Sequence, residues 1–347
     1  MESNYKLTQY SHGAGCGCKI SPALLDKILA GTVKNQVNPS LLVGNEEKDD
    51  AAVLDLGDGT ALISTTDFFM PIVDDPFDFG RIAAVNAISD VYAMGGTPLL
   101  AIAILGWPID KLPPDVAGKV IDGAKEVCKS AGISLAGGHS IDSPEPIFGL
   151  AVNGRVLIKN LKKNGGAKPG DLLFLTKGLG VGILSTAQKK NLLLPEDAET
   201  ALLSMTKLND LGVLLGTLSY VHALTDVTGF GLAGHLTEMM EASNTSAFID
   251  YPALPLLDRK AVFYYIEKGC IPGGTKRNYV SYGHKLEIKS EDQINILCDP
   301  QTSGGLLIAI DKNHAEEFIQ LIKTKESINL KPIGNVISKE NKSILVG

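Results

Sequence analysis

The 347-residue sequence has no apolar run long enough to span a membrane. Its longest apolar runs, such as residues 98–107, fall well short of the roughly 20 residues that a transmembrane helix needs. The first ten residues also lack the apolar stretch of a secretory signal peptide. The sequence therefore predicts a cytoplasmic protein.

The chain also contains few cysteines and carries no net positive charge. Five cysteines, an odd number in a chain of this length, do not indicate a disulfide framework, so a reducing compartment is expected. The formal net charge of −7 argues against a broad nucleic-acid-binding face. Apolar residues make up 44% of the chain and charged residues 20%, which excludes disorder. This composition and length predict a globular protein with two domains of ordinary size.

A glycine-rich segment near the N-terminus carries the most reactive side chains. Residues 9–19 read QYSHGAGCGCK, and glycines at alternate positions disfavour both helix and packed strand. Cys16, Cys18 and Lys19 place two thiols and an ammonium group within four residues, and a thiol beside a cation loses its proton more easily than usual. The segment therefore predicts a reactive thiolate. Zinc held by these thiols and His12 is less favoured, because Cys-x-Cys is one residue too short and no second pair follows.

The remaining sequence predicts an α+β protein. Strands and helices alternate without a regular βαβ order, so we expect mixed or antiparallel sheets rather than a doubly wound fold. We place a mobile catalytic segment with few core anchors at residues 1–20, an N-terminal domain at 21–158 and a C-terminal α+β domain at 159–347. The second boundary rests on residues 160–170, which are rich in Lys, Asn and Gly.

Some predicted elements bear on the site. A hairpin is expected around the Gly-Asp-Gly turn at residues 57–59, and a helix is expected over residues 78–94 with Asn86 and Asp90 on one face. The strand at residues 133–136 is expected to break at the following Gly-Gly-His-Ser. Residues 273–278 are expected to form a loop.

Four aspartates, Asp50, Asp67, Asp90 and Asp226, lie at the ends of elements or on a polar helix face within apolar surroundings. Carboxylates in one cleft raise each other's pKa unless a cation neutralises them, and hard oxygen ligands select the Mg²⁺ that bridges phosphates. Taken singly, each aspartate is better explained as a helix cap, turn former or surface charge. The sequence alone does not bring them together.

Three further patterns have competing interpretations. Gly138, His139 and Ser140 suit a phosphate approached by main-chain N–H groups, or a plain turn, and the absence of G-x-x-x-x-G-K-[ST] excludes a P-loop. Residues 229–234 formally match the dinucleotide fingerprint G-x-G-x-x-G, but polar residues precede the first glycine where an apolar strand is required. The histidines beside glycines, His139 among them, are expected to be turn or cap residues, because no G-x-S-x-G motif accompanies them.

Seven stretches together resemble the selenophosphate synthetase (selenide, water dikinase) family, in its cysteine-containing form. They are residues 7–19, 45–52, 64–69, 86–90, 136–140, 225–231 and 298–305. The resemblance covers nearly the whole chain in the family's order. It implies ATP-dependent conversion of selenide and water to selenophosphate, AMP and orthophosphate, in the two-domain fold of the aminoimidazole ribonucleotide synthetases.

The resemblance also implies roles for individual residues. Cys16 matches the reactive cysteine or selenocysteine, Lys19 the essential lysine, and Asp50, Asp90 and Asp226 the Mg²⁺ ligands. The nucleotide contacts match Lys19, Glu47, Lys48, Asp49, Asp67, Asp90, Gly138, His139 and Ser140, the last three reached partly across a homodimer. The alternatives are a ligase of the aminoimidazole ribonucleotide synthetase type and a non-catalytic ATP-binding sensor. The intact Cys16 and Lys19 argue against both.

Overall fold

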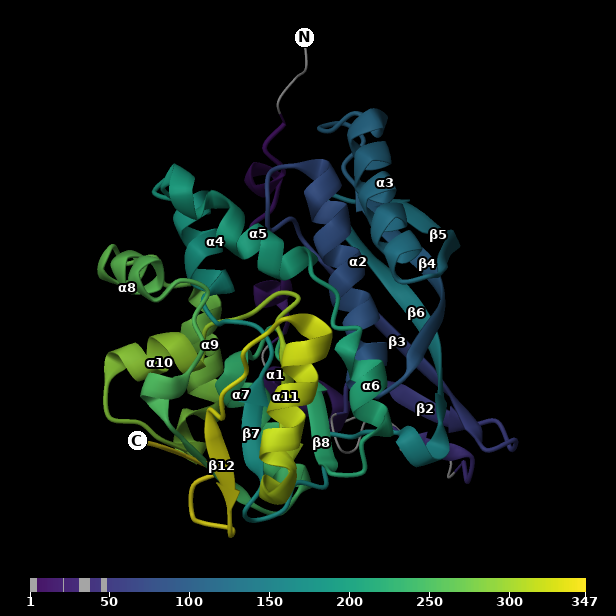
Figure 1. Ribbon diagram of the computed structural model, residues 1–347. Coiled ribbons are helices and arrows are strands. Elements are labelled where there is room, and N and C mark those ends of the chain that lie inside the picture. Colours follow the sequence, from purple (N-terminus) through teal and green to yellow (C-terminus); the bar gives the residue numbers. More distant parts are fainter. Residues whose placement is uncertain (1–4, 21, 31–37, 45–48) are drawn as a thin grey trace.

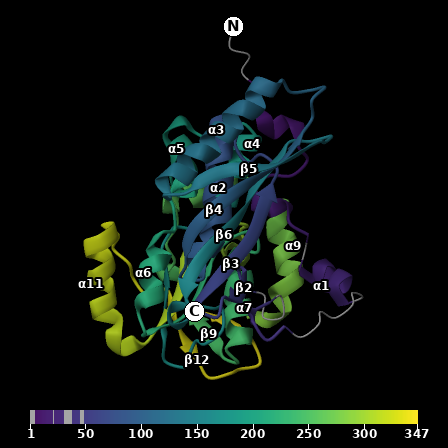
Figure 2. The ribbon, with the colours of Figure 1, turned by 90° about the vertical axis from the view of Figure 1, so that its right-hand side faces the viewer.

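The computed structural model describes residues 5–20, 22–30, 38–44 and 49–347. Within these ranges the strands form one sheet of six strands and one of seven, and helices pack against both (Figures 1 and 2). The sheets are mixed, as the sequence predicts. No helix in the described part of the chain has the length and apolar character needed to cross a bilayer.

The first sheet is built from the N-terminal half. Its strands, in spatial order, are β1 (Leu41–Val43), β2 (Ala52–Asp55), β3 (Thr60–Phe69), β6 (Ile147–Leu157), β4 (Thr97–Trp107) and β5 (Ser134–Asp142). β4 and β5 are parallel and the other neighbours antiparallel. The predicted hairpin is present as β2 and β3. Helices α2 (Pro76–Ala93) and α3 (Pro114–Ser130) pack against this sheet.

The second sheet is built from the C-terminal half. Its order is β10 (Leu286–Glu287), β13 (Ile344–Val346), β9 (Ser246–Ile249), β12 (Gly334–Ile337), β7 (Leu172–Leu175), β11 (Leu306–Ile310) and β8 (Val221–Asp226). β13 is parallel to both β10 and β9, and the other pairs are antiparallel. Every side chain of β11 is buried, which explains its uninterrupted apolar sequence.

The remaining helices are mostly in the second half. They are α1 (Pro22–Ala30), α4 (Val181–Lys189), α5 (Ala198–Thr206), α6 (Leu211–Thr217), α7 (Gly231–Ala242), α8 (Arg259–Glu267), α9 (Gly273–Tyr282), α10 (Glu291–Leu297) and α11 (Ala315–Glu326). Apolar side chains of α6 and α11 form a core with one face of the second sheet, including Phe318 against Phe174 at 5.1 Å between ring centroids.

Helix α2 joins the two halves. The Asp75 carboxylate caps its first turn by accepting from the main-chain N–H of Asp78 at 2.9 Å, and Pro76 occupies the first helical position. The helix is buried almost all round because it contacts β3 and β6 on one side and α5, α6 and β8 on the other. The polar residues Asn86, Ser89 and Asp90 therefore face the boundary between the halves.

Two sequence predictions about local structure are wrong. The strand does not break at Gly137 and Gly138, because β5 continues to Asp142 with a register shift opposite β4. Both glycines have positive φ, 135° and 156°, and a Cβ on Gly138 would lie 2.2 Å from the carbonyl oxygen of Ala103. Glycine thus allows an irregular strand at close range, rather than ending it.

Residues 273–278 form the first turns of α9 instead of a loop. Tertiary contacts override their weak helix propensity. The side chain of Asn278 donates to the carbonyl oxygens of Gly229 at 2.9 Å and Cys298 at 3.0 Å, and Gly274 packs closely on Pro300.

Candidate active site

The glycine-rich segment lies between the two halves and is anchored there. Leu7 and Cys16 are completely buried, so the prediction of few core anchors is wrong. The main-chain N–H of Gly15 donates to the carbonyl oxygen of Met70 at 3.0 Å, and that of Cys16 donates to Oγ1 of Thr302 at 3.0 Å. Residues from both halves therefore hold the loop, while its mobility stays a prediction.

Two glycines, which carry no Cβ, allow the loop to pack closely against both halves. Gly15 has a φ of 50°, and a Cβ there would lie 2.5 Å from Oγ1 of Thr302. A Cβ on Gly229 would lie 2.5 Å from the carbonyl oxygen of Cys16. The first glycine of the dinucleotide-like pattern thus accommodates the cysteine loop, which gives it a role without any dinucleotide.

Asn86 connects Cys16 to the Lys19–Asp67 pair. Its Oδ1 accepts from Sγ of Cys16 at 3.2 Å and from the main-chain N–H of Ser303 at 2.8 Å. Its Nδ2 donates to Oδ2 of Asp67 at 2.6 Å, and the same oxygen accepts from Nζ of Lys19 at 3.0 Å. One buried carboxamide therefore links the thiol to the Lys19–Asp67 ion pair.

The structure overturns the prediction of an activated thiolate in this conformation. Burial raises the pKa of the Cys16 thiol well above its usual value, the charge of Asp67 raises it further, and Lys19 opposes both without reversing them. Burial, the largest single cause, lowers the pKa of Lys19, but the surrounding negative groups, Asp67 foremost, together outweigh it and the pKa is raised. The thiol is neutral here, and Lys19 is paired with a carboxylate.

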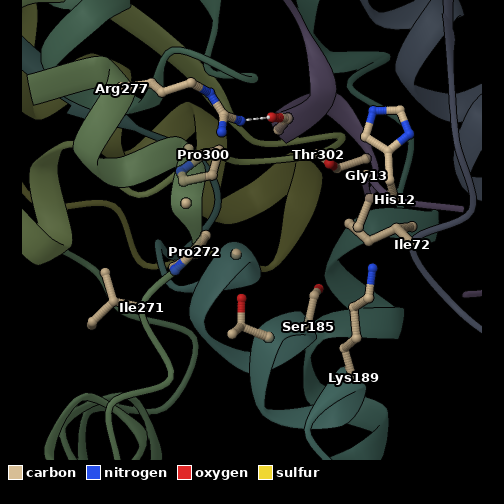
Figure 3. Close-up of a pocket in the computed structure, with 16 residues that line it drawn as sticks. His12, Gly13, Ile72, Ser185, Lys189, Ile271, Pro272, Arg277, Pro300 and Thr302 are labelled. Atoms are coloured by element: carbon tan, nitrogen blue, oxygen red, sulfur yellow. Dashed lines mark hydrogen bonds between the residues drawn. The ribbon is translucent and has the colours of Figure 1, made fainter. Parts of the chain in front are cut away.

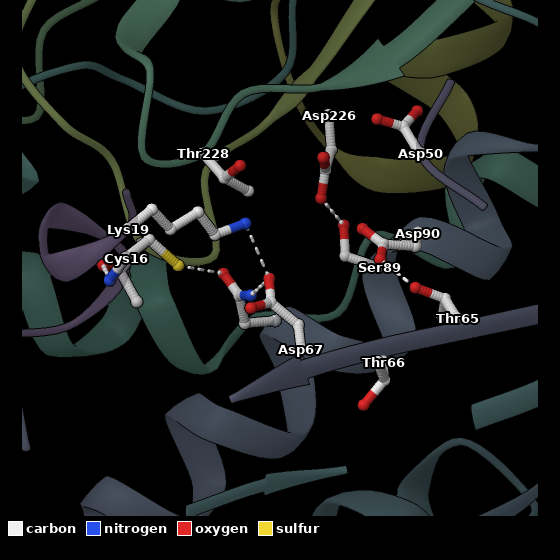
Figure 4. A network of polar contacts seen from close by, with 12 residues as sticks. Cys16, Lys19, Asp50, Thr65, Thr66, Asp67, Ser89, Asp90, Asp226 and Thr228 are labelled. Atoms are coloured by element: carbon white, nitrogen blue, oxygen red, sulfur yellow. Dashed lines mark hydrogen bonds and ion pairs between the residues drawn. The ribbon is translucent and has the colours of Figure 1, made fainter. Parts of the chain in front are cut away.

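Asp50, Asp90 and Asp226 are brought to the boundary between the halves, each with a hydroxyl partner. Oδ1 of Asp50 accepts from Thr225 at 2.9 Å. Oδ2 of Asp90 accepts from Thr65 and Oδ2 of Asp226 from Ser89, both at 2.5 Å. In Figure 4, Asp50, Asp90 and Asp226 form a group beside the Lys19–Asp67 pair.

These carboxyl groups resist ionisation. Burial, followed by the charges of Asp226 and Asp90, raises the pKa of Asp50 well above its usual value. Burial and the charges of Asp226 and Asp67 do the same for Asp90, and burial raises the pKa of Asp226 to about 6. Closely spaced buried carboxyls cannot all be charged at neutral pH without a cation.

The donor set fits a hard divalent cation in its chemistry. Oδ2 of Asp50 is buried and has no hydrogen-bond partner among the described residues, which leaves one oxygen available to a ligand. In the same described ranges, no three His, Cys, Asp or Glu side chains are already arranged around one point as a metal site. The oxygens therefore suit Mg²⁺ in type and charge, and their side chains need to adjust to bind it.

The other predicted nucleotide contacts are placed differently. Oδ1 of Asp49 accepts from the main-chain N–H of Asn164 at 2.6 Å, beside the acidic group. Glu47 and Lys48 lie outside the described residues. Gly138, His139 and Ser140 lie on β5, three strands away from Asp67 on β3, or about 14 Å at the usual spacing. One chain does not bring all of these residues together.

The side chains of His12 and His235 each have a polar partner in the structure. Nδ1 of His12 pairs with the Glu145 carboxylate at 2.9 Å, whereas Cys16 faces Asn86, so these two candidate zinc ligands do not converge. Nε2 of His235 accepts from the main-chain N–H of Thr228 at 3.1 Å. Burial lowers the pKa of His235 to about 3, which keeps this ring neutral.

Sequence reasoning missed the neutral polar residues of the site. Asn86 was noted only for sharing a helix face with Asp90, and the hydroxyl partners of the aspartates carry no motif of their own. The hydroxyl partners of the aspartates are Thr65, Ser89 and Thr225, and the Thr302 hydroxyl accepts from the main-chain N–H of Cys16. Their positions next to aspartates or within the 298–305 stretch are the signal that could have identified them.

Comparisons with known proteins agree with the two-part fold. The family model described as "AIR synthase related protein, N-terminal domain" matches residues 48–156, and the corresponding C-terminal domain matches residues 168–347. Thiamine-monophosphate kinase from Stenotrophomonas maltophilia has a TM-score of 0.65 at 21% identity, covering 93% of this chain and 95% of that one. Hydrogenase maturation protein HypE in complex with ATP has a TM-score of 0.62 at 20% identity, covering 87% and 82%. These two likenesses establish the fold.

Sequence relatives are much closer. A protein of Aeromonas hydrophila subsp. hydrophila named selenide, water dikinase is 60% identical over 334 residues, which cover 96% of each chain. A protein of Yersinia pestis with the same name is 59% identical over 341 residues, covering 98% of this chain and 97% of the relative. The chain therefore belongs to the selenide, water dikinase family of AIR synthase-related proteins.

Proposed function

We propose that this chain catalyses the ATP-dependent synthesis of selenophosphate from selenide and water, releasing AMP and orthophosphate. Selenophosphate would then serve as the selenium donor for selenocysteine and selenouridine. The observation that supports this best is the Asn86 carboxamide, which joins the Cys16 thiol to the Lys19–Asp67 pair beside a group of buried carboxylates. A soft nucleophile, a cation and a metal-binding acidic cradle are the parts that phosphoryl transfer to selenium requires.

Asp50, Asp90 and Asp226 would hold Mg²⁺. When bound, Mg²⁺ neutralises the charge on the triphosphate and on the leaving phosphate. The buried, unpartnered Oδ2 of Asp50 and the raised pKa values of all three carboxyl groups support this assignment, because a cation removes the cost of their ionisation.

Lys19 would bind the phosphates of ATP. In this structure its ammonium group is paired with Asp67, and its side chain is 34% exposed, so a phosphate oxygen can reach it. Asp67 would then be free to contact the nucleotide, and the Asn86–Asp67 bond would transmit the change to Cys16. Cys16 would deliver or orient selenium, once it leaves the buried position in which its proton is retained.

A homodimer would complete the nucleotide site. β5 is an edge strand with mostly exposed residues, and apolar side chains such as Phe68 and Ile141 are exposed on the same sheet, at 47% and 59%. Exposed edges with apolar neighbours are usually covered by a partner. If the six-stranded sheets of two chains pair with each other, residues 138–140 of one chain would lie towards the Lys19–Asp67 pair of the other.

The state of the cysteines favours a reducing compartment for this enzyme. All five cysteines lie within the described residues and are free. Because a reactive Cys16 must remain reduced to act, we propose the cytoplasm as its location.

Phosphorus NMR of a reaction containing ATP, Mg²⁺ and selenide tests the proposed activity. The dikinase should form AMP, orthophosphate and a phosphorus–selenium species in equal amounts. A ligase of the aminoimidazole ribonucleotide synthetase type would leave ADP, and a non-catalytic sensor would leave ATP intact. Accumulation of ADP without a phosphorus–selenium signal would replace the dikinase by the ligase.

A further inference from the structure

The loop that carries Cys16 separates two cavities. A cavity of about 270 Å³ is lined by Gly13, Ala14 and Gly17 on one side of the loop. A second cavity of about 440 Å³ is lined by Cys18, Lys19 and Asp67 on the other side. Cys16 belongs to neither lining, because it is completely buried between them. Cys16 is thus covered on both sides, and a movement of the loop could uncover it towards either cavity.

The two cavities differ in charge. The larger one contains the Asp67 carboxylate and lies on the side of the proposed nucleotide site. The smaller one is lined by Lys189 of α4 and Arg277 of α9, and none of the described residues that line it is Asp or Glu. We call the smaller cavity the cationic chamber and define it by Gly13, Gly17, Lys189, Arg277 and Thr302.

The basic side chains approach the cationic chamber from opposite sides (Figure 3). Arg277 donates through Nη2 to the carbonyl oxygen of Gly17 at 2.5 Å, which uses only part of its guanidinium group. Nζ of Lys189 lies 3.4 Å from the carbonyl oxygen of Ser11, a long contact to a neutral group, and the described part of the chain shows no ion pair to Lys189. Both contacts are to neutral carbonyls of the cysteine-bearing segment, so the chamber keeps its positive character.

The chamber is also connected to Cys16. Thr302 lines the chamber, and its Oγ1 accepts from the main-chain N–H of Cys16. Uncovering Cys16 towards the chamber requires the loop to give up this hydrogen bond together with those to Met70 and Asn86. The volume lies below the roughly 300–1,000 Å³ of sites that enclose drug-sized ligands, so the chamber suits a small hydrated anion better than a nucleotide.

Electrostatics distinguishes the two directions of approach. Hydrogen selenide is a stronger acid than hydrogen sulfide, so at neutral pH the selenium substrate is the hydroselenide anion. On the nucleotide side this anion would meet Asp67, the acidic group and the triphosphate. On the other side it would meet Lys189 and Arg277, and the Glu145 carboxylate in contact with that lining is paired with His12. Cations facing a cavity raise the local concentration of an anionic substrate.

We propose that the cationic chamber admits hydroselenide to Cys16 from the side opposite the nucleotide. This inference rests on the proposed function, since it assigns a route to that function's anionic substrate. Lys189 and Arg277 attract and orient the anion, and the loop keeps it apart from ATP until Cys16 is uncovered. Orthophosphate, the other product, is also a small anion that Lys189 and Arg277 could bind. The experiments below distinguish a hydroselenide site from an orthophosphate site.

Bromide is a suitable probe because it is isoelectronic with hydroselenide and scatters anomalously. In crystals soaked in bromide, an anomalous peak is expected between Lys189 and Arg277. The peak should disappear in Lys189→Glu and persist in Lys190→Glu. Lys190 is a matched control, because it directly follows Lys189 at the C-terminal end of α4 and its Nζ donates to the carbonyl oxygen of Gly269 instead. A chamber without bromide in the wild-type protein would overturn the proposal.

Steady-state kinetics supplies the second measurement. Reversing the charge of Lys189 should lower kcat/KM for selenide about tenfold, with a smaller loss in the neutral variant Lys189→Met. The KM for ATP should change far less, and Lys190→Glu should match the wild type. Melting temperatures of the variants check that they fold.

The outcomes separate this inference from the proposed function. Wild-type kcat/KM for selenide in Lys189→Glu would overturn the route and leave the activity standing. Loss of orthophosphate inhibition with unchanged selenide kinetics would overturn it in favour of a product site. If the wild-type protein makes no selenophosphate, the proposed function fails, whereas the bromide measurement still decides whether the chamber binds anions.

Discussion

Sγ of Cys16 donates a hydrogen bond to Oδ1 of Asn86 across 3.2 Å, and neither side chain is exposed to solvent. Burial and the charge of Asp67 favour the neutral thiol, and Lys19, the cation that opposes them, is already paired with Asp67. The docked segment is therefore a protected arrangement of the reactive cysteine, and Asn86 is the residue that positions it.

Asn86→Ala should release the segment. Removal of the carboxamide leaves the main-chain N–H of Ser303 without its partner and takes one donor from Asp67. We expect the free energy of unfolding to fall by about 2–4 kcal/mol, since buried groups lose their hydrogen bonds. Alkylation of Cys16 by iodoacetamide, followed by peptide mass spectrometry, should become faster, and turnover should drop.

The control for this change is Asn341→Ala, which removes an exposed carboxamide between β12 and β13. It should leave stability, alkylation and turnover at wild-type values. If Asn86→Ala alkylates at the wild-type rate despite its lower stability, the link between Asn86 and protection of the thiol is wrong.

Asp226 should make the stability of the metal-free protein depend on pH. Burial raises its pKa to about 6 in the folded state, against about 3.9 when unfolded. The stabilisation from its proton is complete below the unfolded pKa and is lost as pH rises through 6, by about 3 kcal/mol. Chemical denaturation from pH 4.5 to 7.5 measures the part of this loss that falls above pH 4.5, about 2 kcal/mol, and Mg²⁺ should restore stability at the upper end.

Asp226→Asn carries no such proton. In the absence of metal, the free energy of unfolding of the wild type should therefore fall relative to that of the variant as pH rises. The same variant should lose Mg²⁺-dependent stabilisation and turnover. Asp50→Ala and Asp90→Ala should also abolish turnover while largely keeping the fold. Parallel pH curves for wild type and Asp226→Asn would refute the buried-carboxyl interpretation, and wild-type turnover in all three variants would refute the metal site.

The N-terminal segment should be protected further by nucleotide. Lys19 gains a phosphate partner when ATP and Mg²⁺ bind together, so the ligand favours the closed state. Limited proteolysis between the cysteine loop and α1, with a non-hydrolysable ATP analogue, should show protection that needs Mg²⁺ and weakens in Lys19→Ala. Equal cleavage in every condition would exclude a closing segment.

Ile141→Lys should dissociate the proposed dimer. Ile141 is 59% exposed on the edge strand β5, so a lysine costs the monomer little but buries a charge in a dimer interface. Sedimentation equilibrium should show monomers with weakened ATP binding. Ile109→Lys, which alters a residue 61% exposed after β4, is the matched control and should remain dimeric. A dimeric Ile141→Lys would place the interface elsewhere.

Local patterns in the sequence determined the α+β class, the β2–β3 hairpin and the long helix α2. Such elements follow from side-chain periodicity and from turn and cap residues within a few positions. The same local patterns predict Cys16 and Lys19 as a reactive pair, because a thiol and a cation so close in the chain remain close in any fold.

Tertiary structure decided what surrounds that pair. Cys16 contacts Asn86 and Thr302, which are 70 and 286 residues away, and only the packing of both halves around α2 brings them together. This packing buries the thiol and raises its pKa, although Lys19 alone predicts the opposite. It also continues β5 through Gly137 and Gly138 and makes a helix of residues 273–278. Burial and long-range contacts outweigh local propensity at these positions, so they could not be read from neighbouring residues.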